Sequence, residues 1–187
     1  MKLDPQSTAL VLIDLQKGIL SRDTAPRSTA EVVATSKTLA DKFRAAGAPV
    51  VLVHVTWSED YGDALSQPTD QPNPRMPADK LAEFAEFADG LRQPTDIIIK
   101  KRQWGAFYGT ELDLQLRRRG VKTIVLGGVA TNMGVESTAR DAYERGYAIV
   151  LAEDICASMK AEWHDFAIQN ILPRISRIMA STDVELS

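Results

Sequence analysis

The chain has 187 residues, of which 44% are hydrophobic and 25% are charged, as is ordinary for one soluble globular domain. Its formal net charge is −3, which gives no reason to expect a nucleic-acid or anionic-membrane partner. No apolar run approaches the roughly 20 residues that span a bilayer, and a single cysteine, Cys156, excludes an internal disulfide and fits a reducing compartment. We therefore expect a single domain over 1–187, located in the cytoplasm.

Short apolar runs alternate with helical patterns along the chain. The runs are nearly continuous in Val, Ile and Leu, which indicates strands buried on both faces, as in a parallel sheet. Six runs predict strands, at 8–14, 49–55, 96–101, 122–129, 148–153 and 175–181. The stretches between them predict helices at 28–46, 110–119, 133–145 and 161–171. This alternation predicts a three-layer α/β fold with right-handed crossovers.

One interval, 58–95, breaks the alternation. Prolines crowd its first half, at Pro68, Pro72, Pro74 and Pro77. A connection of this length is usually functional or mobile. We expect an excursion over the sheet edge that forms a lid or a subunit contact, with a short helix near 79–88.

Three strand ends carry residues that suggest chemistry, because ligands of open α/β sheets bind outside the carboxyl ends of the strands. Asp14 closes the first strand in "LIDLQKG", and Lys100 and Lys101 close the third in "IIIKKRQWGAF". The fourth strand leads into "GGVATNMGVESTAR", where Gly134 occupies the first turn of a predicted helix. A lone charge at a strand end is more often a solvated terminus, but two opposite charges that could flank one crevice favour a functional site.

Other kinds of site find little support in the sequence. The stretch "GGVATNMG" has neither the G-x-G-x-x-G spacing nor a P-loop lysine, so no phosphate cofactor is expected. His54 and His164 lie in no metal-ligand pattern, so no metal is expected. Cys156 fits a small buried residue better than a nucleophile. Ser137 has no neighbouring histidine that would activate it.

In this order, the blocks "ALVLIDLQ", "KRQWGAFYGTEL", "GGVATNMGVESTARDAYERGY" and "EDICAS" resemble the isochorismatase-like hydrolases over essentially the whole chain. That superfamily also holds nicotinamidases and other cysteine amidohydrolases. The resemblance implies a Rossmann-like αβα sandwich whose six parallel strands have the order 3-2-1-4-5-6. It also implies a homo-oligomer that acts on a small molecule without a cofactor.

The resemblance aligns the Asp–Lys–Cys catalytic triad of the family with Asp14, Lys101 and Gly134, so the nucleophile is absent. It also implies a cis peptide between Val129 and Ala130. Members with true isochorismatase activity lack the cysteine as well. The Asp-x-His metal motif of nicotinamidases is replaced by "TWSED" here.

The implied function is hydrolysis of the vinyl ether of isochorismate or a related small acid. Asp14 would be the general acid, Lys101 would orient it and offset substrate charge, and Gly134 would leave room for the substrate. Burial would raise the pKa of Asp14 and the lysine would lower it, and the sequence does not decide between these effects.

We expect substrate contacts from five further residues: Ala130, Gln16, Trp57, Trp104 and Phe107. Core packing is an equally good interpretation of the three aromatic residues. Two other functions stay open. One is hydrolysis of a different small substrate, with a water activated by Asp14, and the other is a binding protein that has lost catalysis with its cysteine.

Overall fold

The computed structural model of the protein describes residues 1–72 and 75–187. Its centre is a six-stranded sheet with the order β4-β3-β2-β5-β6-β7, in which every neighbouring pair is parallel. The strands are β2 (Thr8–Ile13), β3 (Val50–Val55), β4 (Ile97–Lys101), β5 (Thr123–Val129), β6 (Ala148–Ala157) and β7 (Arg177–Met179). Numbered along the chain within this sheet, they have the order 3-2-1-4-5-6, which confirms the predicted α/β class.

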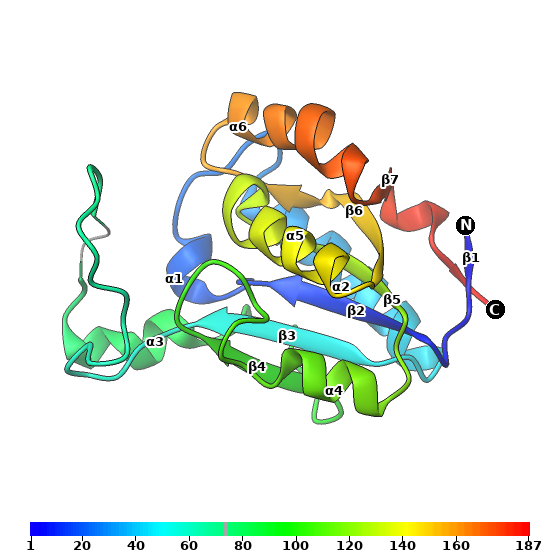
Figure 1. Ribbon diagram of the computed structural model, residues 1–187, viewed down its shortest axis with the longest axis horizontal. Helices are drawn as coiled ribbons and strands as arrows, with labels where there is room; N and C mark the ends of the chain where they lie inside the picture. Colours follow the sequence, from blue (N-terminus) through cyan, green and yellow to red (C-terminus); the bar gives the residue numbers. More distant parts are fainter. Residues whose placement is uncertain (73–74) are drawn as a thin grey trace.

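Helices cover both faces of this sheet (Figure 1). The helices are α1 (Lys17–Leu20), α2 (Thr29–Ala45), α3 (Leu81–Ala85), α4 (Leu112–Arg118), α5 (Glu136–Glu144) and α6 (Ala161–Phe166). Short helical turns complete the fold, at η1 (Ala78–Lys80), η2 (Thr131–Val135), η3 (Ala167–Ile171), η4 (Leu172–Arg174) and η5 (Ser181–Asp183). The helix α2 begins at a capping box, in which Ser28 and Glu31 each bond to the backbone N–H of the other.

The six residues of β2 are all buried, and alternate side chains enter two separate cores. Ala9, Val11 and Ile13 pack with α4, α5 and η3, whereas Leu10 and Leu12 pack with α2. This arrangement explains why the strand lacks polar alternation, because helices cover it on both sides. The carboxyl end of β2 therefore lies at the middle of the sheet.

Several element boundaries differ from the prediction. The helix expected at 133–145 is divided into η2 and α5, and the helix expected at 161–171 is divided into α6 and η3. The strand β6 continues to Ala157 because its pairing with β5 shifts register after Leu126 and resumes at Gly128. A second sheet, formed by β1 (Lys2–Leu3) and β8 (Glu185–Leu186), was not predicted and pairs the two ends of the chain in parallel.

Residues 58–72 extend away from the body of the protein beside α3 (Figure 1). The helix expected near 79–88 is present as η1 and α3, which end at Ala85. Residues 73–74, and with them Pro74, lie outside the described residues. Across the described residues, none of the helices has the length and apolar character that crossing a membrane requires.

Candidate active site

Asp14 follows directly after β2 and adopts a left-handed backbone conformation, with φ 53°. Aspartate tolerates this conformation better than most residues with a side chain. The Asp14 N–H still bonds to the carbonyl of Val53 in the neighbouring strand, at 2.9 Å. The chain therefore leaves the sheet abruptly at Asp14, and its carboxyl group is buried with only 6% of the residue exposed.

Lys101 is the last residue of β4 and is 1% exposed, whereas Lys100 is exposed. Its Nζ lies 2.8 Å from Asp14 Oδ2 and also donates a hydrogen bond to the Trp104 carbonyl at 2.5 Å. The predicted ion pair between Asp14 and Lys101 is confirmed. A buried ion pair of this kind has a high desolvation cost, so its retention is more typical of a functional site than of a device for stability.

Burial raises the pKa of the Asp14 carboxyl to about 6, and the charge and hydrogen bond of Lys101 limit the rise. Of the two opposing effects on the pKa of Asp14 that the sequence left undecided, burial is therefore the larger. Oδ1 of the same carboxyl is buried and has no hydrogen-bond partner among residues 1–72 and 75–187. An unpaired buried polar atom costs about 1–3 kcal/mol, so such an atom calls for a functional explanation.

Gly134, in η2, lies against this ion pair. A Cβ atom built on Gly134 would be 3.2 Å from Lys101 Nζ, 3.3 Å from Asp14 Oδ2 and 2.9 Å from Ile13 Cγ2. The three residues that end β2, end β4 and follow β5 thus converge at one place on the carboxyl edge of the sheet, as predicted. The absent side chain of position 134 lets the η2 backbone pack closely against the carboxyl and ammonium groups.

The segment that carries Gly134 has an unusual backbone. The peptide between Val129 and Ala130 is cis, as the resemblance implied. The Val135 N–H bonds at 3.2 Å to the carbonyl of Ala130, five positions earlier, so this turn is wider than in an α-helix, and the Met133 N–H bonds to the same carbonyl at 3.1 Å. The first N–H groups of a helix lack partners within it and favour anions.

Gly128, just before this turn, explains the "GG" of the sequence. Its φ is 130°, and a Cβ there would lie 2.1 Å from the Ile13 carbonyl oxygen. Only glycine allows the end of β5 to approach β2 this closely. Close approach of these two strands brings Asp14 and Gly134 together.

A chain of buried and partly buried polar groups anchors the same turn from its other side. Thr131 Oγ1 lies 2.8 Å from His164 Nδ1, and His164 Nε2 lies 3.0 Å from Glu153 Oε1. Arg27 makes two bonds of 2.8 Å to the Glu153 carboxylate. Burial raises the pKa of Glu153, but the bonds from Arg27 and His164 outweigh it and hold that pKa below its ordinary value. Sequence reasoning missed this chain, because its members are far apart in sequence and match no motif.

Gln16 is fully buried, and its amide bonds to three backbone groups. Nε2 donates to the carbonyls of Val55 and Phe84, both at 2.9 Å, and Oε1 accepts from the Val55 N–H at 2.7 Å. These bonds fasten the segment after β2 to β3 and α3. The assignment of Gln16 as a substrate contact stays a prediction, and the structure gives the residue a structural role.

The aromatic residues of the predicted site differ in their surroundings. Trp57 stacks on Tyr61 at 5.8 Å and donates to the Arg102 carbonyl, and Trp104 is 54% exposed. Phe107 is 3% exposed and packs against Tyr147 in the core between the sheet and the helices α4 and α5. Ala130 is buried at the start of the Gly134 turn. Substrate contact by these four residues also stays a prediction.

Cys156 is fully buried in β6, as its predicted structural role requires. Burial raises the pKa of its thiol to about 12, so the thiol stays protonated and unreactive near neutral pH. No group of three or more His, Cys, Asp or Glu side chains is arranged to hold a metal ion within residues 1–72 and 75–187. The site is thus composed of a carboxyl group, an ammonium group and the backbone turn at Gly134.

The chain is similar to known proteins over most of its length. Residues 8–183 match the isochorismatase domain family. The chain is 50% identical to the uncharacterized isochorismatase family protein YecD of Escherichia coli O157:H7, over 98% of this chain and 97% of YecD. It is 34% identical to the ureidoacrylate amidohydrolase RutB of Methylobacterium radiotolerans, over 90% of this chain and 74% of RutB.

The solved structure of a similar protein has nearly the same fold. An isochorismatase family protein from Burkholderia thailandensis superimposes with a TM-score of 0.93 and 44% identity, over 98% of this chain and 95% of that one. The family match, the identity to relatives and the shared fold all extend over nearly the full length. The chain belongs to the isochorismatase family.

Proposed function

We propose that this chain is an isochorismatase-type hydrolase that cleaves the vinyl ether of isochorismate or a related small acid. The observation that carries the proposal is the state of Asp14: a buried carboxyl with a pKa of about 6 and one oxygen that has no partner among the described residues, beside a glycine that supplies no thiol. A carboxyl group with such a pKa is still partly protonated near neutral pH, as a general acid must be.

The reaction begins with transfer of the Asp14 proton to the terminal methylene carbon of the vinyl ether. The resulting oxocarbenium ion adds water, and the hemiketal collapses to pyruvate and a dihydrodiol acid. The added water releases a proton that can restore the carboxyl group. No step of this chemistry needs a thiol, which agrees with glycine at position 134.

Lys101 has a defined role in this scheme. When Asp14 gives up its proton, a negative charge forms 2.8 Å from the Lys101 ammonium. A preorganised cation that faces a developing charge in a site of low dielectric stabilises the transition state. Because the Trp104 carbonyl also holds Nζ, this charge is in place before the reaction begins.

The Gly134 turn supplies the binding part of the proposal. The helical segment that continues into α5 begins at η2, and N–H groups at the start of a helix favour a carboxylate. Trp57 and Trp104 would form walls of the pocket.

A second function is hydrolysis of an amide, and the name of the relative RutB, a ureidoacrylate amidohydrolase, favours it. The usual thiol nucleophile is missing, since position 134 is glycine and Cys156 is buried with a raised pKa. Ionised Asp14 would then have to activate a water. The two functions need opposite protonation states of Asp14, so the dependence of rate on pH distinguishes them. A binding protein without catalysis would show neither dependence.

The test is a screen of purified protein against isochorismate, ureidoacrylate, nicotinamide and simple amides, with pyruvate and ammonia measured separately. Asp14→Asn, which keeps the shape but has no acidic proton, is the matched control. We expect pyruvate from isochorismate with wild type and little with the variant, and no appreciable ammonia from nicotinamide. Ammonia without pyruvate would instead establish amide hydrolysis. Absence of both products would favour the binding function.

A further inference from the structure

The two sides of the catalytic centre come from strands that do not touch. Lys101 ends β4 and Gly134 follows β5, and the strands β3 and β2 lie between them in the sheet. Sheet hydrogen bonds therefore do not join β4 to β5 directly. The sheet thus sets the spacing between the Lys101 ammonium and the Gly134 turn only through two intervening strands, and a direct contact between the two sides would fix it further.

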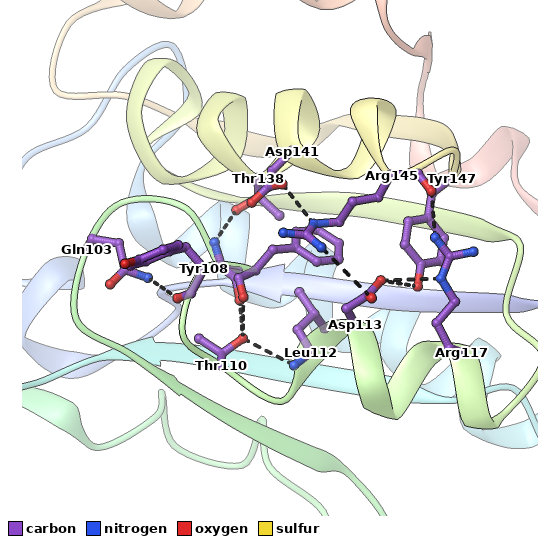
Figure 2. Close-up of polar contacts among 12 residues, drawn as sticks. Gln103, Tyr108, Thr110, Leu112, Asp113, Arg117, Thr138, Asp141, Arg145 and Tyr147 are labelled. Atoms are coloured by element: carbon purple, nitrogen blue, oxygen red, sulfur yellow. Dashed lines mark hydrogen bonds and ion pairs between the residues drawn. The ribbon is translucent and has the colours of Figure 1, made fainter.

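Thr138 supplies such a contact from α5, one turn after Gly134. Its hydroxyl is fully buried, donates to the Gly134 carbonyl at 2.6 Å and accepts from the Ala106 N–H at 3.2 Å. One hydroxyl has one proton and two lone pairs, so both bonds can exist at once. Figure 2 shows Thr138 pointing from α5 toward the loop that follows β4.

That loop also holds the catalytic lysine. Lys101 Nζ donates to the Trp104 carbonyl, two residues before Ala106. Between them, a Cβ built on Gly105 would lie 3.7 Å from Ser137 Cβ, so the loop backbone rests closely on α5. The contacts therefore run from Lys101 through the loop to the Thr138 hydroxyl and on to the Gly134 carbonyl.

We propose that Thr138 is a positioning residue, which acts by fixing the loop that holds the Lys101 ammonium relative to the Gly134 turn. The inference rests on the proposed function of the Asp14 site for its kinetic effect, but its geometric effect exists without any substrate. Displacement of a catalytic group by about 1 Å can lower a rate about 100-fold. Thr138 itself contacts neither Asp14 nor Lys101 through any hydrogen bond that the described residues make.

The same loop provides a matched control in Thr110. Its hydroxyl donates to the Ala106 carbonyl at 2.6 Å and accepts from the Leu112 N–H at 3.1 Å. These bonds stabilise the loop where it enters α4, and they do not reach the Gly134 turn (Figure 2). Thr110→Val thus removes a comparable hydroxyl from the loop while leaving the bridge to Gly134 intact.

The experiment compares Thr138→Val, Thr138→Ser and Thr110→Val with wild type by two measurements. The first is the titration of the Asp14 carboxyl by 13C NMR without substrate, with the signal assigned by its loss in Asp14→Asn. Because Lys101 is the charged group that lowers the pKa of Asp14, a loosened lysine should raise the Thr138→Val midpoint by roughly half a pH unit or more. Thr138→Ser and Thr110→Val should keep the wild-type midpoint.

The second measurement is kcat and KM for pyruvate release. We expect Thr138→Val to lower kcat about 10- to 100-fold with a smaller change in KM, Thr138→Ser to recover most of the loss, and Thr110→Val to keep the wild-type kcat. If Thr138→Val does not fold, Thr138→Ala replaces it. An unshifted midpoint in the folded variant, or equal effects in Thr110→Val, would overturn the inference. Shifted midpoints in a protein that releases no pyruvate would sustain the inference and overturn only the proposed function.

Discussion

Replacement of Gly134 by alanine tests why this position has no side chain. The new Cβ would lie 2.9 Å from Ile13 Cγ2, whereas carbon atoms in contact prefer about 3.5–4.0 Å. One of the two groups must therefore move by about 0.6 Å or more. Overpacking of this kind costs about 1–3 kcal/mol, and the better helix propensity of alanine returns up to about 1 kcal/mol. We expect a net loss of about 1–2 kcal/mol in the free energy of unfolding.

The effect on activity should be larger than the effect on stability. The same methyl group would lie 3.2 Å from Lys101 Nζ and 3.3 Å from Asp14 Oδ2, so it would press on the two groups to which we assign the chemistry. We expect kcat/KM for pyruvate release to fall at least 10-fold, which corresponds to about 1.4 kcal/mol of transition-state stabilisation. Urea denaturation and steady-state kinetics on the same preparations measure the two effects separately.

A second substitution distinguishes crowding in the core from obstruction of the site. Ile13→Leu removes the β-branched methyl group that the new Cβ would meet while conserving side-chain volume, a change that usually costs less than about 1.5 kcal/mol. The pair Ile13→Leu and Gly134→Ala should therefore be more stable than the sum of the single effects, yet stay inactive. Gly105→Ala is the control, since its Cβ would have no neighbour nearer than 3.7 Å. Wild-type activity in the double variant would refute the view that activity requires position 134 to have no side chain.

Three further predictions concern the charges and the thiol. Lys101→Met removes the cation that lowers the pKa of Asp14, so the Asp14 midpoint should move above 6 by NMR titration while kcat falls about 10-fold or more. Cys156→Ala should keep activity within about 2-fold, because burial keeps the thiol protonated, and inactivation of wild type by a mild thiol reagent would contradict this. Folding raises the pKa of Asp14 from 3.8 to about 6, so its contribution to stability is greatest below pH 4 and is lost as pH rises through 6. Relative to Asp14→Asn, wild type should therefore lose about 2 kcal/mol of unfolding free energy between pH 4 and 7, and a gain measured by urea denaturation would contradict this.

The sequence predicted the residues of the site better than the contacts that hold them in place. Asp14, Lys101 and Gly134 were found because parallel strands bring their carboxyl ends to one edge, and because short motifs in "KRQWGAF" and "GGVATNMG" aligned with a known family. Lys101 rather than Lys100 followed from that alignment, and burial of the one and exposure of the other agree with it.

The contacts that hold the site in place could not be predicted, for physical reasons. The bonds of Gln16 join residues 39 and 68 positions apart, and the pair of Arg27 and Glu153 spans 126 positions. Such contacts depend on the tertiary fold and leave no local periodicity. The wide turn of η2 was also invisible, because its sequence fits the first turn of an ordinary helix, and the two-residue strands β1 and β8 are too short to show a pattern.

The central claim is that protonated Asp14 donates a proton to substrate, and the pH dependence of pyruvate release from isochorismate tests it most directly. With a pKa of about 6, wild-type kcat should be constant at low pH and fall about 10-fold for each pH unit above the midpoint. Folded Asp14→Asn, checked by circular dichroism, should be about 100- to 10,000-fold slower at pH 5.5. A rate that rises as pH increases through 6, or full activity in Asp14→Asn, would contradict the claim.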